Sequence, residues 1–428
     1  MSTTPVQTTL NVLELAQAGR FAEIHELLAP TLQAMAPPQA LKASWDAELG
    51  RQGAVTSIGQ PVCEPANAGV VVVKVPVASE RGGFALVAAV TEEGRLAGLQ
   101  IAPPGAAEPI APWEPPAYAD ATAFTENEVT LGSAPLAVPG TLAVPNQPGR
   151  HPGVVLLAGS GSLDRDETIG RNKPFKDIAW GLASRGVATL RFDKVTYAHA
   201  SEVKDMRDFT LADEYLPNAI AAAKLLEEHP AVDPDRVFVL GHSLGGTVAP
   251  RVAAAEPSVA GMIVLAGGAE PLQWVIVRQT RYLASLRPDT EATAQPAIDA
   301  LTEKARMVDS PDLSPSTPPS ELPLGAPASY WLDLRDYNPV EVAAALRKPM
   351  LILQGGRDYQ VTVADDLARW EAGLGDRANV TIRVYPDHNH LFTPGSGPST
   401  PDEYEPAQHV DATIVADIAA WLEPVPGS

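Results

Sequence analysis

The sequence is poor in cysteine, in positive charge and in long apolar runs. Its single cysteine, Cys63, cannot form an intramolecular disulfide, and there is no pair of thiols for a cysteine-based zinc site. Lysine and arginine number 31 against 52 aspartate and glutamate residues, which gives a formal net charge of −21 over 428 residues. Because phosphate neutralisation requires clustered basic side chains, we do not expect the protein to bind nucleic acid.

Stretches without charge are short throughout the chain. No run of about eighteen apolar residues predicts a membrane span, and charged residues at positions 14, 20, 23 and 26 interrupt the region where a signal peptide would lie. We therefore expect a soluble, cytoplasmic protein that does not bind a membrane. Apolar residues still make up 45% of the chain, enough for a large buried core, which excludes an intrinsically disordered protein.

Proline, in contrast, is abundant, and its distribution marks a domain boundary. Six prolines fall within residues 102–118, which predicts a semi-rigid linker there. Before the linker, helical patterns at 10–16, 21–28 and 38–49 are followed by strand patterns at 70–77, 83–90 and 96–101. Helices followed by a run of strands predict a small α+β domain over residues 1–101.

After the linker, short apolar runs alternate with amphipathic helical patterns. The predicted strands are 154–157, 187–192, 237–240, 261–265, 350–353 and 380–384, and the predicted helices are 175–184, 211–226, 244–255, 363–374 and 411–421. This alternation predicts an α/β domain over residues 119–428, with a mostly parallel sheet and helices on both faces. Residues 269–347 interrupt it between two strands, so we expect an inserted helical lid at the carboxyl ends of the strands.

The motif Gly-His-Ser-Leu-Gly-Gly at residues 241–246 lies between a predicted strand and a predicted helix. This setting is typical of a nucleophile elbow, in which a tight turn exposes the serine and the helix N-terminus stabilises developing negative charge. Small residues are needed beside the serine, which explains Gly241 and Gly245. The motif therefore predicts Ser243 as a nucleophile, although a glycine-rich turn beneath a helix is an alternative.

A serine nucleophile needs a base and an acid that orients the base, and the expected chain order is serine, acid, histidine. Asp358 follows strand 350–353, and both His388 and His390 follow strand 380–384. Asp358 could instead cap the next helix. The two histidines could form a metal-binding pair, but no further histidine or cysteine cluster completes such a site. We expect His390 to be the base, because apolar residues after it can anchor its loop, whereas the polar neighbours of His388 suit an exposed turn.

The glycine- and serine-rich loop at 158–163 follows strand 154–157. We expect the backbone N–H groups of Ser160 and Leu244 to form an oxyanion hole, with Gly161 as the next candidate donor. A phosphate-binding loop is the alternative, but no Lys-Ser or Lys-Thr pair follows at the required spacing. We expect the charged residues 164–167 to form a salt-bridged structural loop.

Bulky residues cluster in the inserted segment, including Trp274 and Tyr330. Exposed on a monomer they would promote aggregation, so we expect them to supply an apolar acyl pocket, with Gly161 and His242 also beside the substrate. The alternative is that these bulky residues only anchor the insertion to the sheet.

From about residue 126 to 421, the chain resembles the α/β-hydrolase superfamily of serine esterases, and in particular the bacterial two-domain type with an N-terminal domain of unknown function. The resemblance is carried by residues 159–168, 172–175, 191–194, 241–246, 353–361 and 389–392. It implies a triad of Ser243, Asp358 and His390 and a lid inserted before the acid strand. The sequence departs from the family at Val195-Thr196, where a second basic residue would be expected after Lys194. The first hundred residues resemble nuclear-transport-factor-like domains, whose role the resemblance does not imply.

Together these features predict a serine hydrolase that cleaves small carboxylic esters through an acyl-enzyme, with no cofactor and no metal. A thioesterase, acyltransferase or peptidase would use the same residues. A non-catalytic binding protein of the same fold is the alternative from another class. For the N-terminal domain we expect a structural or dimerising role, which would give a homodimer, or a gating role.

Overall fold

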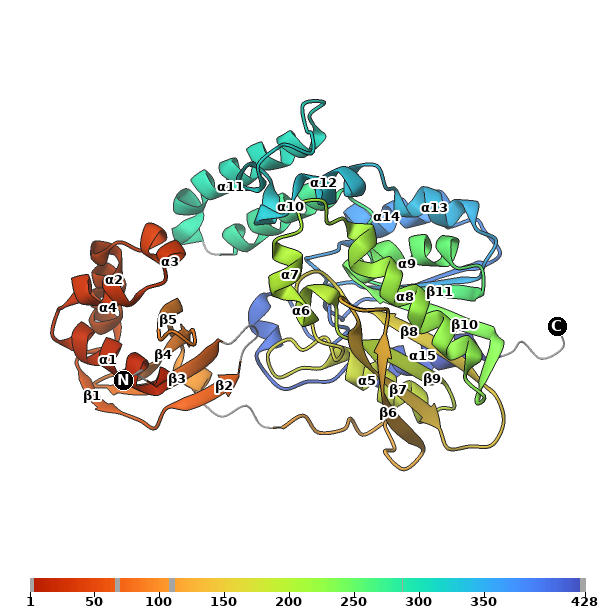
Figure 1. Cartoon of the computed structure of the whole chain (residues 1–428), viewed down its shortest axis with the longest axis horizontal. Coiled ribbons are helices and arrows are strands. Elements are labelled where there is room, and N and C mark those ends of the chain that lie inside the picture. The colour runs from red at the N-terminus through yellow and green to blue at the C-terminus, as the bar shows by residue number, and fades with distance from the viewer. Residues whose placement is uncertain (1–3, 66–69, 108–111, 287, 424–428) are drawn as a thin grey trace. The chain divides into compact units, whose positions relative to one another are not determined.

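The computed structural model describes residues 4–65, 70–107, 112–286 and 288–423 (Figure 1). The chain divides into two compact units, Met1–Pro112 and Trp113–Ser428, and the division falls inside the segment predicted as a linker. The second half of that segment packs on the second unit. There the Trp113 indole donates a hydrogen bond to Asp177, and the Tyr118 hydroxyl donates one to the Val410 carbonyl.

The first unit has a layer of helices beside an antiparallel sheet, as the sequence predicts. Its helices are α1 (Pro5–Gln17), α2 (Phe21–Leu27), α3 (Pro30–Met35) and α4 (Pro38–Gln52), and its strands are β1 (Val55–Ile58), β2 (Val62–Pro65), β3 (Val71–Ser79), β4 (Gly82–Val90) and β5 (Leu96–Ala102). The sheet order is β1-β3-β4-β5, and β2 also pairs with β3. Alternate residues Val73, Val75 and Val77 of β3 are buried in the same core as Trp45 of α4. A short helical turn, η1 (Pro104–Ala107), follows.

The second unit is built on an eight-stranded sheet in the order β13-β12-β11-β10-β8-β9-β7-β6. Its strands are β6 (Phe124–Leu131), β7 (Val138–Pro145), β8 (His151–Leu157), β9 (Ala188–Phe192), β10 (Val232–His242), β11 (Val259–Leu265), β12 (Met350–Gly355) and β13 (Val380–Tyr385). Strands β8 to β13 are parallel, whereas β7 runs antiparallel to both β6 and β9. Our sequence analysis assigned neither β6 nor β7, because polar residues interrupt the apolar pattern of β6, and prolines and a glycine interrupt that of β7.

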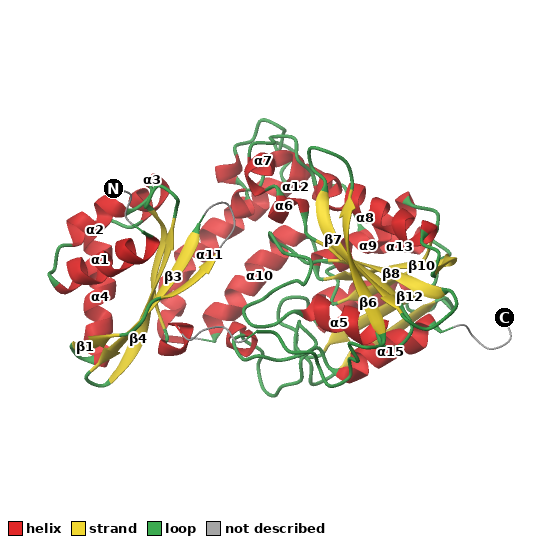
Figure 2. Ribbon diagram, turned by 60° about the horizontal axis from the view of Figure 1, so that its bottom comes forward, coloured by secondary structure: helices red, strands yellow, loops and turns green. Residues whose placement is uncertain are grey.

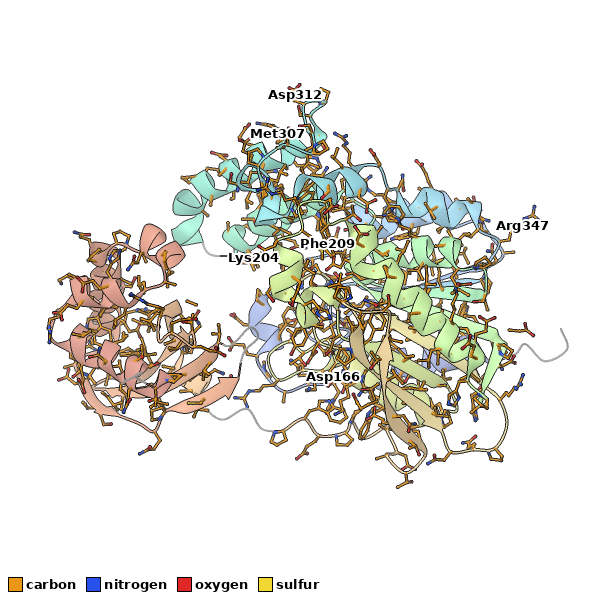
Figure 3. All side chains as sticks on the ribbon, viewed as in Figure 1. Asp166, Lys204, Phe209, Met307, Asp312 and Arg347 are labelled. Carbon is orange, nitrogen blue, oxygen red and sulfur yellow. The ribbon has the colours of Figure 1, made fainter. Side chains whose placement is uncertain are left out.

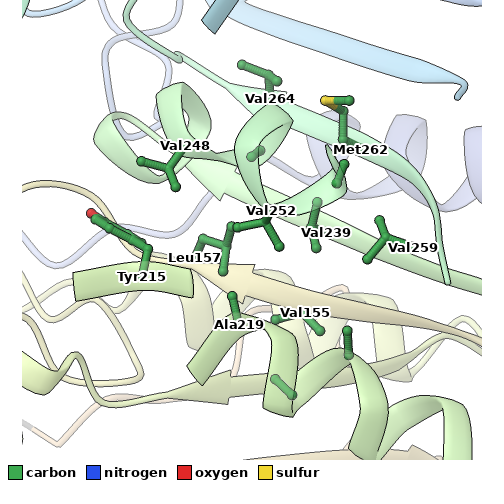
Figure 4. Packing of buried hydrophobic residues seen from close by; sticks show 14 of the residues in the cluster. Val155, Leu157, Tyr215, Ala219, Val239, Val248, Val252, Val259, Met262 and Val264 are labelled. Atoms are coloured by element: carbon green, nitrogen blue, oxygen red, sulfur yellow. The ribbon is translucent and has the colours of Figure 1, made fainter. Parts of the chain in front are cut away.

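Helices cover both faces of this sheet (Figure 2). They are α5 (Pro174–Ala183), α6 (Val195–Ala198), α7 (Ala200–Lys204), α8 (Leu211–Glu228), α9 (Leu244–Ala255), α14 (Ala368–Leu374) and α15 (Ala412–Leu422). A π-helical turn, η4 (Val363–Leu367), leads into α14, and a short turn, η5 (Pro401–Tyr404), precedes α15. Because side chains alternate along a strand, β8 contributes residues to the hydrophobic cores on both faces of the sheet. Val155 and Leu157 pack with α8 and α9 (Figure 4), whereas Val154 and Leu156 pack with α5 and α15.

Residues 269–347 form a helical insertion between β11 and β12, as predicted. It contains α10 (Leu272–Ser285), α11 (Pro288–Asp309), η2 (Pro319–Glu321), η3 (Pro323–Gly325), α12 (Ala328–Arg335) and α13 (Pro339–Ala345). Most of it packs around its own small core, which includes the buried Trp331, but Ala343 of α13 belongs to the core of the sheet. Among the described residues, no helix is both long and apolar enough to cross a membrane.

Strand order places two loops side by side. The chain passes from β8 to β9 on one side and returns to β10 on the other, so β8 and β10 flank the topological switch point. In open α/β sheets, ligands bind outside the carboxyl ends of the strands at such a point. The loop after β8 carries Ser160, and the turn after β10 carries Ser243.

Candidate active site

Ser243 occupies a sharp turn between β10, which ends at His242, and α9, which begins at Leu244. Its backbone has φ 54° and ψ −120°, a strained conformation for a residue with a side chain. The turn is possible only because Gly245 lacks a side chain: a Cβ there would lie 2.0 Å from the carbonyl oxygen of Leu157. The surrounding fold thus holds Ser243 in the geometry expected of a nucleophile elbow.

Asp358 and His390 form a buried pair. His390 Nδ1 lies 2.7 Å from Asp358 Oδ2, and the Asp358 side chain has no solvent exposure. The other carboxylate oxygen, Oδ1, accepts hydrogen bonds from the backbone N–H groups of Gln360 and Val361, and Gln354 Nε2 donates to Oδ2. These contacts fix the carboxylate, and the bond at Nδ1 leaves Nε2 as the ring nitrogen that can accept a proton.

His388 lies in a different environment from the one we expected. Its side chain is only 13% exposed, its ring contacts Tyr385, and its Nε2 lies 3.5 Å from Asp411 Oδ2. The expectation of an exposed turn is therefore wrong, because the loop folds back at an isolated bridge between His388 and Pro394. His388 and His390 face different carboxylates, which does not fit their interpretation as a metal-binding pair.

A cavity of about 500 Å³ opens at Ser243. Ser160, Ser243 and Leu244 all line it, so the structure brings the proposed nucleophile together with both predicted oxyanion donors. Gly159 makes this approach possible, because a Cβ at that position would lie 3.2 Å from the Cβ of Ser243. Leu244 is the first residue of α9, and the first N–H groups of a helix have no acceptor within the helix.

The insertion supplies much of the cavity wall, in part through aliphatic side chains. One stripe of α10 supplies the aliphatic residues Leu272, Val275, Ile276 and Leu283, together with Gln273, Gln279 and Thr280. Other parts of the insertion and the loop after β12 supply further residues, among them Leu324, Leu334, Tyr337 and Val361. The cavity could therefore hold a small, largely apolar group next to Ser243.

Trp274 and Tyr330, which we predicted in this pocket, do not line it. Trp274 lies on α10 outside the stripe that lines the cavity. Its indole N–H donates a hydrogen bond to Asp309 Oδ2. The Tyr330 hydroxyl donates to Glu214 Oε2 at 2.6 Å and anchors the insertion to α8. For Tyr330, this contact fits our alternative interpretation, in which the bulky residues anchor the insertion.

Gly161 and His242 are also absent from the cavity wall. Gly161 is exposed at the surface of its loop, with φ +94°. His242 is buried beneath the site, where its Nδ1 lies 3.0 Å from Glu167 Oε1 and its Nε2 lies 2.9 Å from the carbonyl oxygen of His390. Strand β10 directs this side chain into the protein and not toward the cavity.

Both ring nitrogens of His242 face hydrogen-bond acceptors. A neutral imidazole has one N–H, so both bonds require an additional proton shared by His242 and Glu167. Burial alone would lower the pKa of His242, but the Glu167 carboxylate, the His390 carbonyl and the Asp358 carboxylate together raise this pKa above its usual range. His242 therefore connects Glu167, in the loop after β8, to the backbone of His390.

We predicted a salt-bridged structural loop at 164–167, and the ion pairs of Arg165 and Asp166 fit that prediction. Asp164 accepts hydrogen bonds from Thr168, Arg165 pairs with Asp193, and Asp166, labelled in Figure 3, pairs with Lys173 and Arg191. Glu167 differs. It is buried, and its Oε1 accepts hydrogen bonds from the Gly159 N–H at 2.6 Å and from His242. Our sequence analysis missed this contact, because nothing in the sequence pattern distinguishes Glu167 from the charged residues next to it.

The α/β-hydrolase family model matches residues 154–407, more than half of the chain, and spans all of the site described above. The chain belongs to the α/β-hydrolase family. It is 39% identical over 344 residues to Esterase EstD of Thermotoga maritima, an alignment that covers 80% of this chain and 77% of that protein. It is also 30% identical to the 2,6-dihydropseudooxynicotine hydrolase of Paenarthrobacter nicotinovorans, over 35% of this α/β-hydrolase and 36% of that one.

Solved structures similar to this α/β-hydrolase include Est1E from Butyrivibrio proteoclasticus. That match has a TM-score of 0.43 and 18% sequence identity, and it covers 69% of this chain and 98% of the other. A crystal structure of the 2,6-dihydroxy-pseudo-oxynicotine hydrolase matches with a TM-score of 0.43 and 20% identity, covering 69% of this chain and 66% of the other.

Proposed function

We propose that this protein is a serine esterase that hydrolyses small carboxylic esters through an acyl-enzyme intermediate. The single observation that carries the proposal is the buried hydrogen bond between Asp358 and His390, whose ring lies 4.6 Å from that of His242, the residue before Ser243. The 39% identity to an esterase over most of both chains favours esters over the thioesters, amides and acyl transfers that the same residues could serve.

In the proposed reaction, Ser243 Oγ attacks the ester carbonyl carbon while His390 Nε2 accepts the hydroxyl proton. Asp358 holds the imidazole in the required tautomer and stabilises the imidazolium. The N–H groups of Ser160 and Leu244 donate to the oxyanion. His390 then returns the proton to the leaving alcohol, and water, activated in the same way, releases the acid from Ser243.

We propose that the insertion acts as a lid whose aliphatic α10 stripe receives the acyl chain. Leu272, Val275, Ile276 and Leu283 carry no charge or hydrogen-bonding group, so they favour an aliphatic acyl group over a polar one. All of the groups assigned here lie in the second unit. We therefore propose that the first unit, with its possible roles in dimerisation or gating, supplies no catalytic group.

A fluorophosphonate probe and a panel of p-nitrophenyl esters graded by acyl length test the proposal. The wild type should be labelled and active, whereas Ser243→Ala should lose labelling and lose at least about 10⁴-fold in kcat while keeping its fold. Ser258→Ala, beyond the far end of α9, is the matched control and should retain both. A folded Ser243→Ala protein with more than a few per cent of wild-type activity would refute the assignment.

A further inference from the structure

A buried lysine lies directly behind the loop that carries Ser160. The Lys194 ammonium lies 2.7 Å from the carbonyl oxygen of Gly159, 2.9 Å from the Tyr215 hydroxyl and 2.9 Å from Glu214 Oε1. Its side chain is only 3% exposed; it donates hydrogen bonds to the Gly159 carbonyl and the Tyr215 hydroxyl, and it forms an ion pair with Glu214. Placing an ammonium in such an environment is costly unless it is paired and hydrogen-bonded, and Lys194 has both an ion-pair partner and hydrogen-bond acceptors.

The carbonyl that Lys194 contacts belongs to the peptide group that supplies the proposed oxyanion donor. The C=O of Gly159 and the N–H of Ser160 are parts of one planar, trans unit and point in opposite directions. Hydrogen bonds at the carbonyl polarise the unit, which strengthens the N–H as a donor. Fixing the carbonyl also fixes the direction of the N–H.

Tyr215 supports the same carbonyl from α8. Its hydroxyl lies 3.0 Å from the Gly159 oxygen and 2.8 Å from the Ala158 oxygen, and its ring is packed in the core beside Leu157 (Figure 4). Burial and the nearby carboxylates of Glu214 and Glu167 raise the pKa of Tyr215 well above its usual range, so the hydroxyl keeps its proton and can donate it.

We propose that Lys194 is a positioning residue that orients and polarises the Gly159–Ser160 peptide, so that the Ser160 N–H stabilises the oxyanion. This inference rests on the proposed esterase function. A purely structural role for Lys194 predicts effects on stability alone. An oxyanion role predicts that kcat falls while KM stays, because the oxyanion exists only in the transition state and the intermediates.

The test uses the full chain with Lys194→Met combined with Glu214→Gln, so that neither charge of the pair is left buried and unpaired. Lys348→Met is the matched control. Its ammonium also bonds backbone carbonyls, those of Ala253, Glu256 and Pro257, but at the far end of α9, roughly 18 Å along the helix from Ser243. Each protein is assayed with p-nitrophenyl butyrate and with an alkyl trifluoromethyl ketone, whose carbonyl adds Ser243 Oγ and becomes an oxyanion.

We expect the double variant to lose about 10- to 100-fold in kcat with little change in KM, and its Ki for the ketone to weaken by a similar factor. The control should match the wild type. Unchanged kcat, or a fall in kcat with an unchanged Ki, would overturn the inference. If the double variant does not fold, the same two quantities, kcat for the ester and Ki for the ketone, are measured for Tyr215→Phe, which removes the other hydrogen bond to the Gly159 carbonyl. Failure of the esterase function itself would appear separately, as a wild type that neither hydrolyses esters nor reacts with fluorophosphonate.

Discussion

Replacing Asp358 by asparagine changes one atom of the proposed acid, and the structure shows which way the new amide should face. If the amide NH₂ faced Gln360 and Val361, two backbone donors would lose their acceptor, at a cost of about 1–3 kcal/mol each. We therefore expect the amide oxygen to keep those bonds and the NH₂ to face His390. His390 Nδ1 must then accept a hydrogen bond, which places its own proton on Nε2.

A proton on Nε2 prevents His390 from acting as a base toward Ser243. In serine proteases the corresponding substitution costs about 10⁴-fold in kcat, which corresponds to about 5 kcal/mol of transition-state stabilisation. We expect a loss of this size for Asp358→Asn with p-nitrophenyl butyrate at pH 7.5, with circular dichroism as the folding control.

The structure offers a matched control for this experiment. Asp177 is also a buried carboxylate that faces a histidine, with Oδ1 3.0 Å from His409 Nδ1, and it accepts a backbone N–H from Val410. It does not line the cavity at Ser243. Asp177→Asn should therefore keep wild-type kcat. If folded Asp358→Asn retained more than about a tenth of wild-type kcat, Asp358 would not be the acid of the site.

Three further outcomes can be measured on the same protein. His390→Ala should abolish esterase activity by about 10⁴-fold or more, whereas His388→Ala should lower thermal stability and leave most of kcat; the reverse pattern would exchange their roles. Ile276→Trp should narrow the cavity and reduce kcat/KM for long acyl chains more than for acetate esters, and equal losses would argue against an acyl pocket on α10. Because the pKa of His242 is raised on folding, the stability it contributes is complete below about pH 6.5 and is lost as pH rises through the folded-state pKa. We therefore expect the wild type to have a higher free energy of unfolding than Glu167→Gln at low pH, and this difference to shrink as the pH rises above about 6.5. Urea titrations of both proteins across this pH range measure the difference. A difference that does not change with pH would contradict a proton shared by His242 and Glu167.

Much of the fold could be predicted because strands and helices carry periodic signals. The helix predicted at 244–255 is α9 with the same bounds. Chain order predicted that Asp358 would lie near a histidine after the next strand, and the apolar residues after His390 selected it over His388 as the partner that the structure shows. Chain order brings the acid and the histidine loop together because parallel strands bring their carboxyl ends to one edge of the sheet, but it does not distinguish two histidines in the same loop.

The walls of the cavity were predicted poorly, since we chose residues by bulk. On α10, the residues that line the cavity are 272, 273, 275, 276, 279, 280 and 283, which form one stripe along the helix, whereas Trp274 lies off that stripe. The direction of a helical side chain depends on the rotation of the helix about its axis, which packing decides. Helical spacing would have found the stripe, but not which face of α10 meets the cavity.

The buried charges around Gly159 could not be predicted from sequence, because they come from four separate segments and no motif links them to one another. In the structure they form two pairs on one backbone segment: Glu167 with His242 at the Gly159 N–H, and Glu214 with Lys194 at the Gly159 carbonyl. If His242 carries its additional proton, each pair is neutral, so the segment is fixed at both ends without adding net charge beside Ser243. A net negative charge there would oppose the oxyanion, and a net positive charge would oppose protonation of His390. Two neutral pairs avoid both effects and still hold the Ser160 N–H in a fixed direction, which is the requirement for a preorganised oxyanion site.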